Sequence, residues 1–193
     1  IRALLKDKDF EIDGFILPAH VSAIVGVNAY GFLDRMKIPA VIAGFEPLDM
    51  LQGIKMLIDQ VNAGNPEIQI QYNRVVKRSG NKWAQKILND VFEIRDEIWR
   101  GFGRIPKSGL KIRDEFEDFD AEIIFDIKKS AGSSKGNKDC ICGDVLKGKR
   151  NPSDCRLFRR SCSPQHPKGP CMVSSEGSCS VYYKYGGDLK RGR

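Results

Sequence analysis

The feature that most constrains this chain is the position of its cysteines, all of which lie in the last third of the sequence. The six thiols follow the spacing C-x-C-x12-C-x6-C-x8-C-x7-C, fall within 40 residues, and begin at Cys140. Few large apolar side chains accompany them, so a hydrophobic core alone does not explain how this region folds. Disulfide bonds, a zinc site and an iron–sulfur cluster are the three devices able to hold it.

Spacing by itself leaves these three alternatives open. Residues 1–10 show no signal peptide of the kind that accompanies secreted, disulfide-bonded domains, although the chain begins with Ile1 rather than Met. Zinc modules usually pair their ligands as C-x2-C, a spacing that is absent here, and His166 is the only histidine nearby. A cluster with four ligands leaves two cysteines for a dithiol pair or as inert buried residues.

The residues around the cysteines resemble the C-terminal signature of the HypD family, which helps to build the iron–cyanide–carbonyl unit of nickel–iron hydrogenases. The strongest likeness is the run Gly-Pro-Cys-Met-Val-Ser-Ser-Glu-Gly-Ser-Cys at residues 169–179, supported by residues 139–148, 151–155 and 162–164. Residues 14–21 and 41–51 resemble motifs of the family's central domain. The family's full chain is considerably longer and has further cysteines in its N-terminal domain, so this sequence corresponds to the C-terminal half.

The resemblance implies a [4Fe-4S] cluster beside a redox-active cysteine pair. Neighbouring thiols in C-x-C point to opposite sides of an extended chain, so one can bind iron while the other faces a thiol partner. The implied ligands, for cofactor and metal alike, are Cys140, Cys155, Cys162 and Cys179. The implied redox pair is Cys142 and Cys171, with Cys171 and Cys179 able to exchange roles.

The resemblance also implies a role and partners. The expected role is that of a redox-active scaffold for assembling the Fe(CN)2CO unit, more than that of a turnover enzyme. The expected partners are a HypC-type small chaperone, a HypE-type cyanide donor and the N-terminal half of the same protein, in the cytoplasm and without nucleic acid or membrane. No run of 18 apolar residues, the signal of a membrane span, occurs in the sequence.

The pattern before the cysteines predicts an open parallel-sheet α/β domain at residues 1–95, followed by a small irregular cysteine-rich domain at residues 96–193, which the resemblance implies to be an iron–sulfur domain. Apolar runs predict buried strands, and helical periodicity between them gives the order β-α-β-α-β-α. The expected strands are 12–17, 40–44 and 68–76, and the expected helices are 21–36, 47–63 and 81–91. Beyond residue 95 the chain is predicted to be glycine-rich and irregular, apart from a short strand at 110–113 and a helix at 121–127.

Two polar residues follow neighbouring strands of the predicted sheet. His20 comes after the first strand and Glu46 after the second. Ligands of open α/β sheets bind at the carboxyl ends of the strands, where an imidazole and a carboxylate serve as an acid–base pair or bind metal. The structural alternative is that both side chains stabilise the helices that begin there. With the resemblance, they are expected to line an interdomain cleft.

Charge divides the chain unevenly. Residues 1–127 hold 17 basic and 20 acidic side chains, whereas residues 128–193 hold 15 and 5. A Gly/Ser/Lys stretch at 128–138 marks the change and predicts a flexible loop. The alternative function is a zinc-stabilised basic binding module on an α/β domain, but no aromatic stacking platform for nucleic acid is evident. Cations near a cluster would raise its reduction potential, and the candidates are Lys147, Arg150, Arg156, Arg159 and Arg160.

Overall fold

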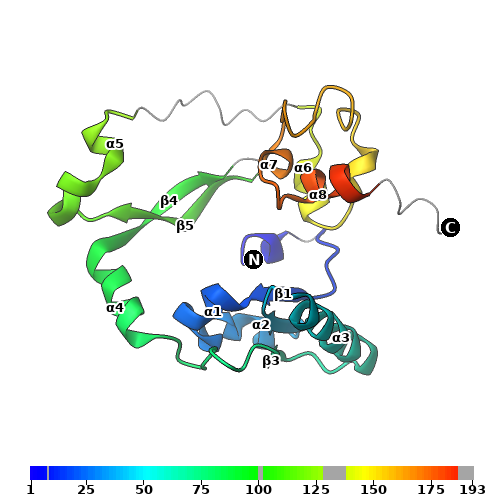
Figure 1. Cartoon of the computed structure of the whole chain (residues 1–193), viewed down its shortest axis with the longest axis horizontal. Helices are drawn as coiled ribbons and strands as arrows, with labels where there is room; N and C mark the ends of the chain where they lie inside the picture. Colours follow the sequence, from blue (N-terminus) through cyan, green and yellow to red (C-terminus); the bar gives the residue numbers. More distant parts are fainter. Residues whose placement is uncertain (8, 100–101, 128–137, 187–193) are drawn as a thin grey trace. The chain divides into compact units, whose positions relative to one another are not determined.

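The computed structural model of the chain describes residues 1–7, 9–99, 102–127 and 138–186 (Figure 1). Its internal contacts divide the chain into two units. One unit is Ile12–Phe92, and the other combines Ile1–Glu11 with the residues from Glu93 onward. The predicted domains, 1–95 and 96–193, differ from this division mainly at the N-terminal segment, which contacts the cysteine-bearing unit.

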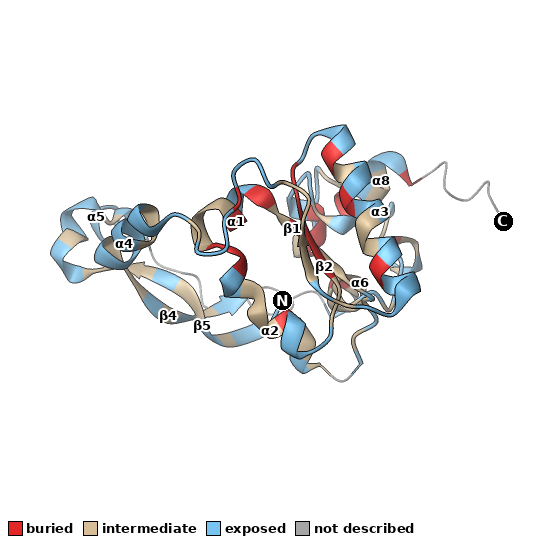
Figure 2. Cartoon of the chain, turned by 90° about the horizontal axis from the view of Figure 1, so that it is seen from below, coloured by how far each residue is buried: buried red, intermediate tan, exposed pale blue. Residues whose placement is uncertain are grey.

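A three-stranded parallel sheet organises the unit Ile12–Phe92. Its strands are β1 (Phe15–Pro18), β2 (Ala40–Ala43) and β3 (Ile68–Ile70), in the order β1-β2-β3. All four residues of the central strand β2 are completely buried, as Figure 2 shows. A short, continuous apolar run is what a strand covered on both faces requires. The predicted parallel α/β arrangement is therefore confirmed.

The helical segment after β1 is broken into three short pieces. These are α1 (Ala19–Val25), the 3-10 helix η2 (Val27–Tyr30) and α2 (Gly31–Arg35). The prediction of one helix over 21–36 is wrong because Gly26 has φ 80°, in the left-handed region that ends an α-helix. A Cβ atom at Gly26 would also lie 2.4 Å from the backbone nitrogen of Gly80, so this position requires glycine.

Helix α3 (Pro47–Ala63) begins and ends where predicted, with proline in its first turn and Gly64 at φ 62° after its last. It packs closely on the sheet at Gly53, where an added Cβ would lie 2.8 Å from Cβ of Ala43. Gln60, which is also buried, donates from Nε2 to the carbonyl of Ala40 at 3.4 Å and accepts the N–H of Glu67 at 3.0 Å. The sheet-facing side of α3 is thus partly polar.

The apolar side of α3 is turned outward. Among the residues predicted to share one face, Leu57 is half-buried, while the others expose 40% to 66% of their surface. The exposed members are Leu48, Leu51, Ile54, Ile58 and Val61. Periodicity identified the helix, but it could not tell which side the sheet would cover.

The third predicted strand is shorter than expected, because the chain turns directly after Ile70. The amides of Gln71 and Tyr72 both donate to the carbonyl of Ile42, which closes the strand pairing there. Helix α4 (Lys82–Val91) follows, and the Asn81 side chain caps it by accepting the Ala84 amide at 3.0 Å, as predicted.

The glycine-rich stretch after residue 95 is not irregular. It forms a two-stranded ribbon of β4 (Phe92–Trp99) and β5 (Gly103–Ile112), so this prediction is wrong. The ribbon requires glycine at position 109, because a Cβ there would lie 2.8 Å from Cβ of Glu97 on the other strand. The 3-10 helix η3 (Asp114–Phe119) and the short helix α5 (Ala121–Ile124) follow, and Asp120 caps α5 as predicted.

Short helices and loops carry the cysteines. They are α6 (Cys142–Leu146), the 3-10 helix η4 (Pro152–Asp154), α7 (Pro170–Val173) and α8 (Ser178–Tyr185). The N-terminal segment, which includes the 3-10 helix η1 (Leu4–Lys6), is tied to this region. Asp7 pairs with Lys147, Asp9 pairs with Lys149 at 3.1 Å, and the Glu11 amide donates to the Lys147 carbonyl at 2.9 Å. The loop predicted at 128–138 lies outside the described residues except for Lys138.

Candidate functional site

All six cysteines line one cavity, although they come from five separate turns of the chain. Cys140 and Cys142 lie at the start of α6, Cys155 follows η4, and Cys162 pairs with Phe158 in an isolated bridge. The remaining two, Cys171 and Cys179, lie in α7 and α8. The structure therefore brings together every cysteine that the sequence singled out, and all of them are free thiols.

The sulfur atoms themselves form much of the core of this region. Cys142, Cys162, Cys171 and Cys179 are 5% to 9% exposed and pack around Met172, whereas Cys140 and Cys155 are half-buried. The apolar side chains that support them are Leu146, Leu157, Phe158 and Tyr183. The open space between the thiols is only about 10 Å³, because they contact one another directly.

Cys171 occupies the middle of the thiol cluster. Its thiol lies within hydrogen-bonding reach of both Cys142 and Cys179, and its Sγ is 3.9 Å from the carbonyl of Cys142. Contact with the Cys171 thiol is the main cause of the lowered pKa of Cys142, which is about 6, and of the lowered pKa of Cys179. The contact with Cys142 in turn raises the pKa of Cys171 well above its ordinary value. Burial raises the pKa of Cys140 to about 12.

Backbone groups approach two of the sulfurs closely. The Lys168 amide donates to Sγ of Cys162 at 3.4 Å. The neighbouring Gly169 lies against Cys140, where an added Cβ would be 2.4 Å from Sγ. The sequence shows glycine directly before Pro170, but only the folded chain shows that Cys140 is what makes glycine necessary. Amide donors at sulfur are a means by which proteins tune cysteine-ligated iron sites.

Two of the five predicted cations already have partners within this unit. Lys147 pairs with Asp7, which raises the pKa of the ammonium group. Arg159 donates to the carbonyl of Tyr183 at 2.7 Å and lies 5.2 Å from the centre of that ring. These side chains therefore serve to hold the region together as well as to add positive charge near the thiols.

A second candidate site lies at the carboxyl end of the parallel sheet. A pocket of about 550 Å³ there contains both His20 and Glu46, the two residues selected from the sequence. The His20 ring meets Phe45 edge-on, with 5.1 Å between ring centres. The remaining lining is mainly apolar and comprises Ala19, Ala23, Ala43, Gly44, Tyr72 and Val75. The roles of His20 and Glu46 as acid–base or metal-binding groups stay predictions.

A buried carboxylate beside this pocket was not among the residues selected from the sequence. Asp49, only 4% exposed, accepts from Nε2 of Gln71 and from Arg74, each at 2.7 Å. The Gln71 hydrogen bond is the main cause of the lowered pKa of Asp49, and Arg74 adds to it. Gly44 completes the packing, because a Cβ there would lie 2.5 Å from Oδ2 of Asp49. The sequence feature that could have identified Asp49 is its position as an acidic residue in the first turn of α3.

Two properties of the described ranges bear on the nature of the sites. No group of three or more His, Cys, Asp or Glu side chains among those residues has the arrangement of a single-ion metal site. Likewise, none of the helices described is both long enough and apolar enough to cross a membrane.

Comparison with known families matches residues 1–186 to HypD, described as the Hydrogenase formation hypA family. The hydrogenase maturation factor HypD2 of Bradyrhizobium diazoefficiens is 48% identical over 178 residues. HypD of Cupriavidus necator is also 48% identical, over 177 residues, and HypD of Rhodobacter capsulatus is 41% identical over 191 residues.

These matches cover most of this chain but only part of each relative. The aligned region is 91% of this chain and 46% of the relative for the first two, and 97% and 51% for the third. The chain thus spans about half the length of the curated relatives it matches. The family match covers nearly all of the sequence and includes every cysteine described above. The chain therefore belongs to the HypD family of hydrogenase maturation factors.

Proposed function

We propose that this chain supplies the cysteine centre of a HypD maturation factor. In this proposal Cys140, Cys155, Cys162 and Cys179 hold a [4Fe-4S] cluster, and Cys142 and Cys171 form a dithiol beside it. The observation that carries the proposal is the convergence of all six cysteines on one cavity, with the Cys142 and Cys171 thiols in hydrogen-bonding reach. Protein-bound [4Fe-4S] clusters take four thiolate ligands, which leaves two thiols for redox work.

The donor set fits such a group. Six reduced thiols face one another in a region with little other core, and the amide of Lys168 already donates to one sulfur. Because the thiols now contact one another, incorporation requires their side chains to separate, and the short helices and loops that carry them can yield more easily than a sheet. When bound, an iron–sulfur cluster supplies one-electron transfer.

The Cys142–Cys171 pair contributes thiol–disulfide chemistry. Its oxidation joins the two sulfurs and releases two electrons and the one proton held by Cys171, which an external disulfide accepts as it is cleaved to a thiol and a thiolate. Cys142, with its lowered pKa, is the thiolate of the pair, and Cys171 holds the proton. Cys171 also contacts Cys179. Experiment must therefore decide which of these two cysteines is the cluster ligand and which is the redox partner of Cys142.

The wider role proposed for the protein is that of an assembly scaffold. Iron is the cargo that acquires cyanide and carbon monoxide, with a HypC-type chaperone and a HypE-type cyanide donor as partners in the cytoplasm. The part of HypD outside this chain contributes further cysteines to that task. The strand-end pocket, with His20 and Glu46, is the proposed surface of this chain nearest to the cargo iron, because polar groups at the ends of parallel strands are where such folds bind ligands.

Anaerobic purification tests the cluster directly. The protein should be brown, with broad visible absorption and about four iron and four sulfide per chain. Colourless protein with stoichiometric zinc would support a zinc-stabilised module instead. Six cysteines found as three disulfides in freshly isolated, oxygen-protected protein would exclude both metal alternatives.

Two matched cysteine variants test the division of labour. Cys155→Ser should abolish the colour because a ligand is lost, whereas Cys142→Ser should retain iron and sulfide and lose only the dithiol. The dithiol is followed by differential alkylation and mass spectrometry after equilibration with a thiol–disulfide buffer. Loss of iron in both variants would overturn the ligand assignment while leaving the cluster itself in place as a finding.

A further inference from the structure

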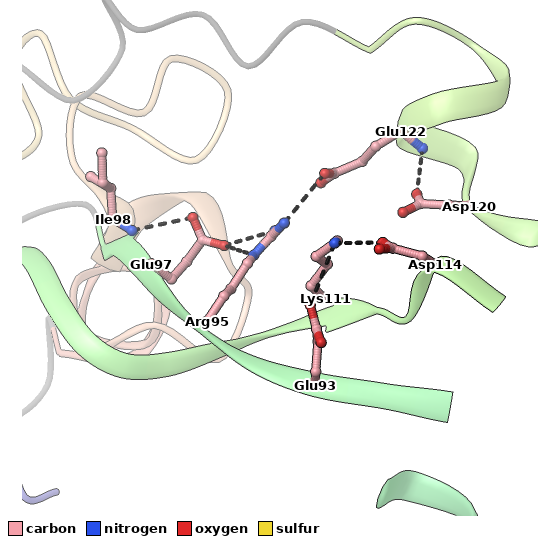
Figure 3. Close-up of polar contacts among 8 residues, drawn as sticks. All are labelled: Glu93, Arg95, Glu97, Ile98, Lys111, Asp114, Asp120 and Glu122. Atoms are coloured by element: carbon pink, nitrogen blue, oxygen red, sulfur yellow. Dashed lines mark hydrogen bonds and ion pairs between the residues drawn. The ribbon is translucent and has the colours of Figure 1, made fainter. Parts of the chain in front are cut away.

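The ribbon of β4 and β5 has one charged face, whose side chains form ion pairs with other residues of the chain. Arg95 of β4 contacts Glu97 at 2.8 Å and reaches Glu122 at 3.6 Å, beside helix α5. Lys111 of β5 lies 3.4 Å from Glu93 and 2.7 Å from Asp114, at the start of η3. Figure 3 shows these side chains directed toward the segment that follows the ribbon. The face turned to the rest of its own unit is therefore built from ion pairs.

The opposite face of the ribbon is open to solvent and carries apolar residues beside an exposed ion pair, formed by Asp96 and Arg104 at 3.1 Å. Side chains alternate between the two faces of a strand, so Ile94 and Ile98, together with Asp96 between them, lie opposite Glu93, Arg95 and Glu97. Gly109 approaches the Cβ of Glu97 on the charged face, which places Leu110 on the apolar one. Ile94 is 68% exposed, Ile98 58% and Leu110 55%. We call these three residues the ribbon's apolar face.

This distribution is the reverse of what a ribbon at the surface of a finished domain shows. Such a strand normally turns its apolar face inward and its charges to water. A two-stranded ribbon is also marginally stable by itself and needs a further layer against a hydrophobic face. The segment after the ribbon, which lies by the charged face, has five exposed apolar side chains of its own, Phe119, Ile123, Ile124, Phe125 and Ile127. Exposed apolar side chains grouped on one face of a ribbon mark a place where another polypeptide packs.

We propose that the ribbon's apolar face is the docking surface for the part of the HypD polypeptide that lies outside this chain. The alignments with the Bradyrhizobium and Cupriavidus relatives cover 91% of this chain but only 46% of the length of each relative. Their remaining sequence is enough to form at least one further domain. The charged face is already engaged by η3 and α5, so the incoming segment packs on the apolar side. The proposal is independent of the cluster and of the redox pair.

Co-expression tests this docking surface. The full chain is produced together with a tagged polypeptide containing the part of Cupriavidus necator HypD that lies outside the matched region. The two should co-purify as a one-to-one complex, measured by size-exclusion chromatography with light scattering. Ile94→Lys and Leu110→Lys should each weaken the complex by about tenfold or more, because a charge is placed in an apolar contact.

Matched variants separate loss of docking from loss of folding. Ile94→Thr combined with Ile98→Thr keeps β-branched side chains, which favour strands, and should still weaken the complex. Tyr185→Lys, at a residue 70% exposed on α8 in the same unit, should leave the complex unchanged. Circular dichroism of each variant checks that its secondary structure matches that of the unsubstituted chain.

Three outcomes would overturn the proposal. The first is failure of the unsubstituted chain to co-purify with the added HypD segment. The second is a complex that is as stable with Ile94→Lys and Leu110→Lys as without them. The third is a dimer of this chain alone that the same substitutions dissociate, because the occupant would then be a second copy. Hydrogen exchange supplies an independent check, since amides of β4 and β5 should become protected when the chain is fused to the added segment.

Discussion

Gly169 lies so close to Cys140 that an added Cβ would be 2.4 Å from the cysteine Sγ. The backbone at Gly169 is extended, with φ −132°, so the requirement for glycine comes from this contact and not from backbone strain. The glycine that precedes Pro170 in the family signature thus has a specific physical task. It allows the loop before α7 to close over a half-buried thiol.

We predict that Gly169→Ala displaces Cys140. Overpacking at a contact this short should lower the stability of the cysteine-bearing unit by about 1–3 kcal/mol. Hydrogen exchange of residues 138–146 measures the effect, and iron content per chain should fall in the anaerobic protein. Gly31→Ala is the control, because its Cβ would meet only a flexible Arg35 atom at 3.9 Å in helix α2. That variant should be neutral or gain about 0.4–1 kcal/mol.

The contact between α3 and β2 leads to a second prediction. Gly53→Val should destabilise the unit Ile12–Phe92 by at least about 1–3 kcal/mol, because even a Cβ at this position would lie 2.8 Å from Cβ of Ala43. Urea denaturation followed by circular dichroism checks this. Leu51→Val, at a position 65% exposed on the same helix, should change the midpoint little. Equal losses in the two variants would show that the exposed side of α3 is also covered in solution.

Asp49 should make stability depend on pH. Its pKa is lowered from 3.8 in the folded protein, chiefly by the hydrogen bond from Gln71. A lowered folded pKa means that the contribution is fully present above the ordinary pKa and is lost as the pH falls through the lower folded value. Asp49→Asn should therefore destabilise the protein near neutral pH and reduce the drop in stability on acidification. Urea midpoints measured at neutral pH and below about pH 4 test this. Parallel curves for the two proteins would contradict it.

The N-terminal segment should stabilise the cysteine-bearing unit. Removing residues 1–11 deletes the contacts of Asp7 and Asp9 with Lys147 and Lys149, as well as the backbone hydrogen bond from Glu11. Lys147 directly follows α6, so hydrogen exchange in that helix should become faster. Asp7→Asn should show a smaller effect in the same direction. Lys55→Gln removes a solvent-exposed pair with Asp59 in α3 and should leave exchange in α6 unchanged.

Some parts of the fold could be predicted because short-range rules govern them. Proline in the first turn and glycine after the last turn mark the ends of α3 through their backbone angles alone. The continuous apolar run of β2 is what a strand buried on both sides needs. The meeting of His20 and Glu46 in one pocket also follows from sequence, since neighbouring parallel strands end at the same edge.

Other features depend on partners far away in the chain. The glycines of the ribbon predicted an irregular segment. The structure shows that Gly109 instead permits close contact with Glu97 on the facing strand. Hydrophobic periodicity could identify α3, but the side that meets the sheet is the one where Gly53 and Gln60 satisfy close approach and hydrogen bonding. Asp49 looked like an ordinary acidic residue of a first turn until Gln71 and Arg74 were placed beside it.

The sequence alone determined the family, the parallel α/β layer and the grouping of six cysteines in the last third of the chain, because motif, periodicity and residue type are local properties that can be read along the chain. Only the tertiary structure decided that Cys171 lies between Cys142 and Cys179, that residues 1–11 pack on the cysteine-bearing unit, and that three apolar side chains of the ribbon face solvent. Those features depend on contacts between segments that are distant in the sequence. Alternative contacts compete in free energy, and the outcome depends on the fold of the whole chain.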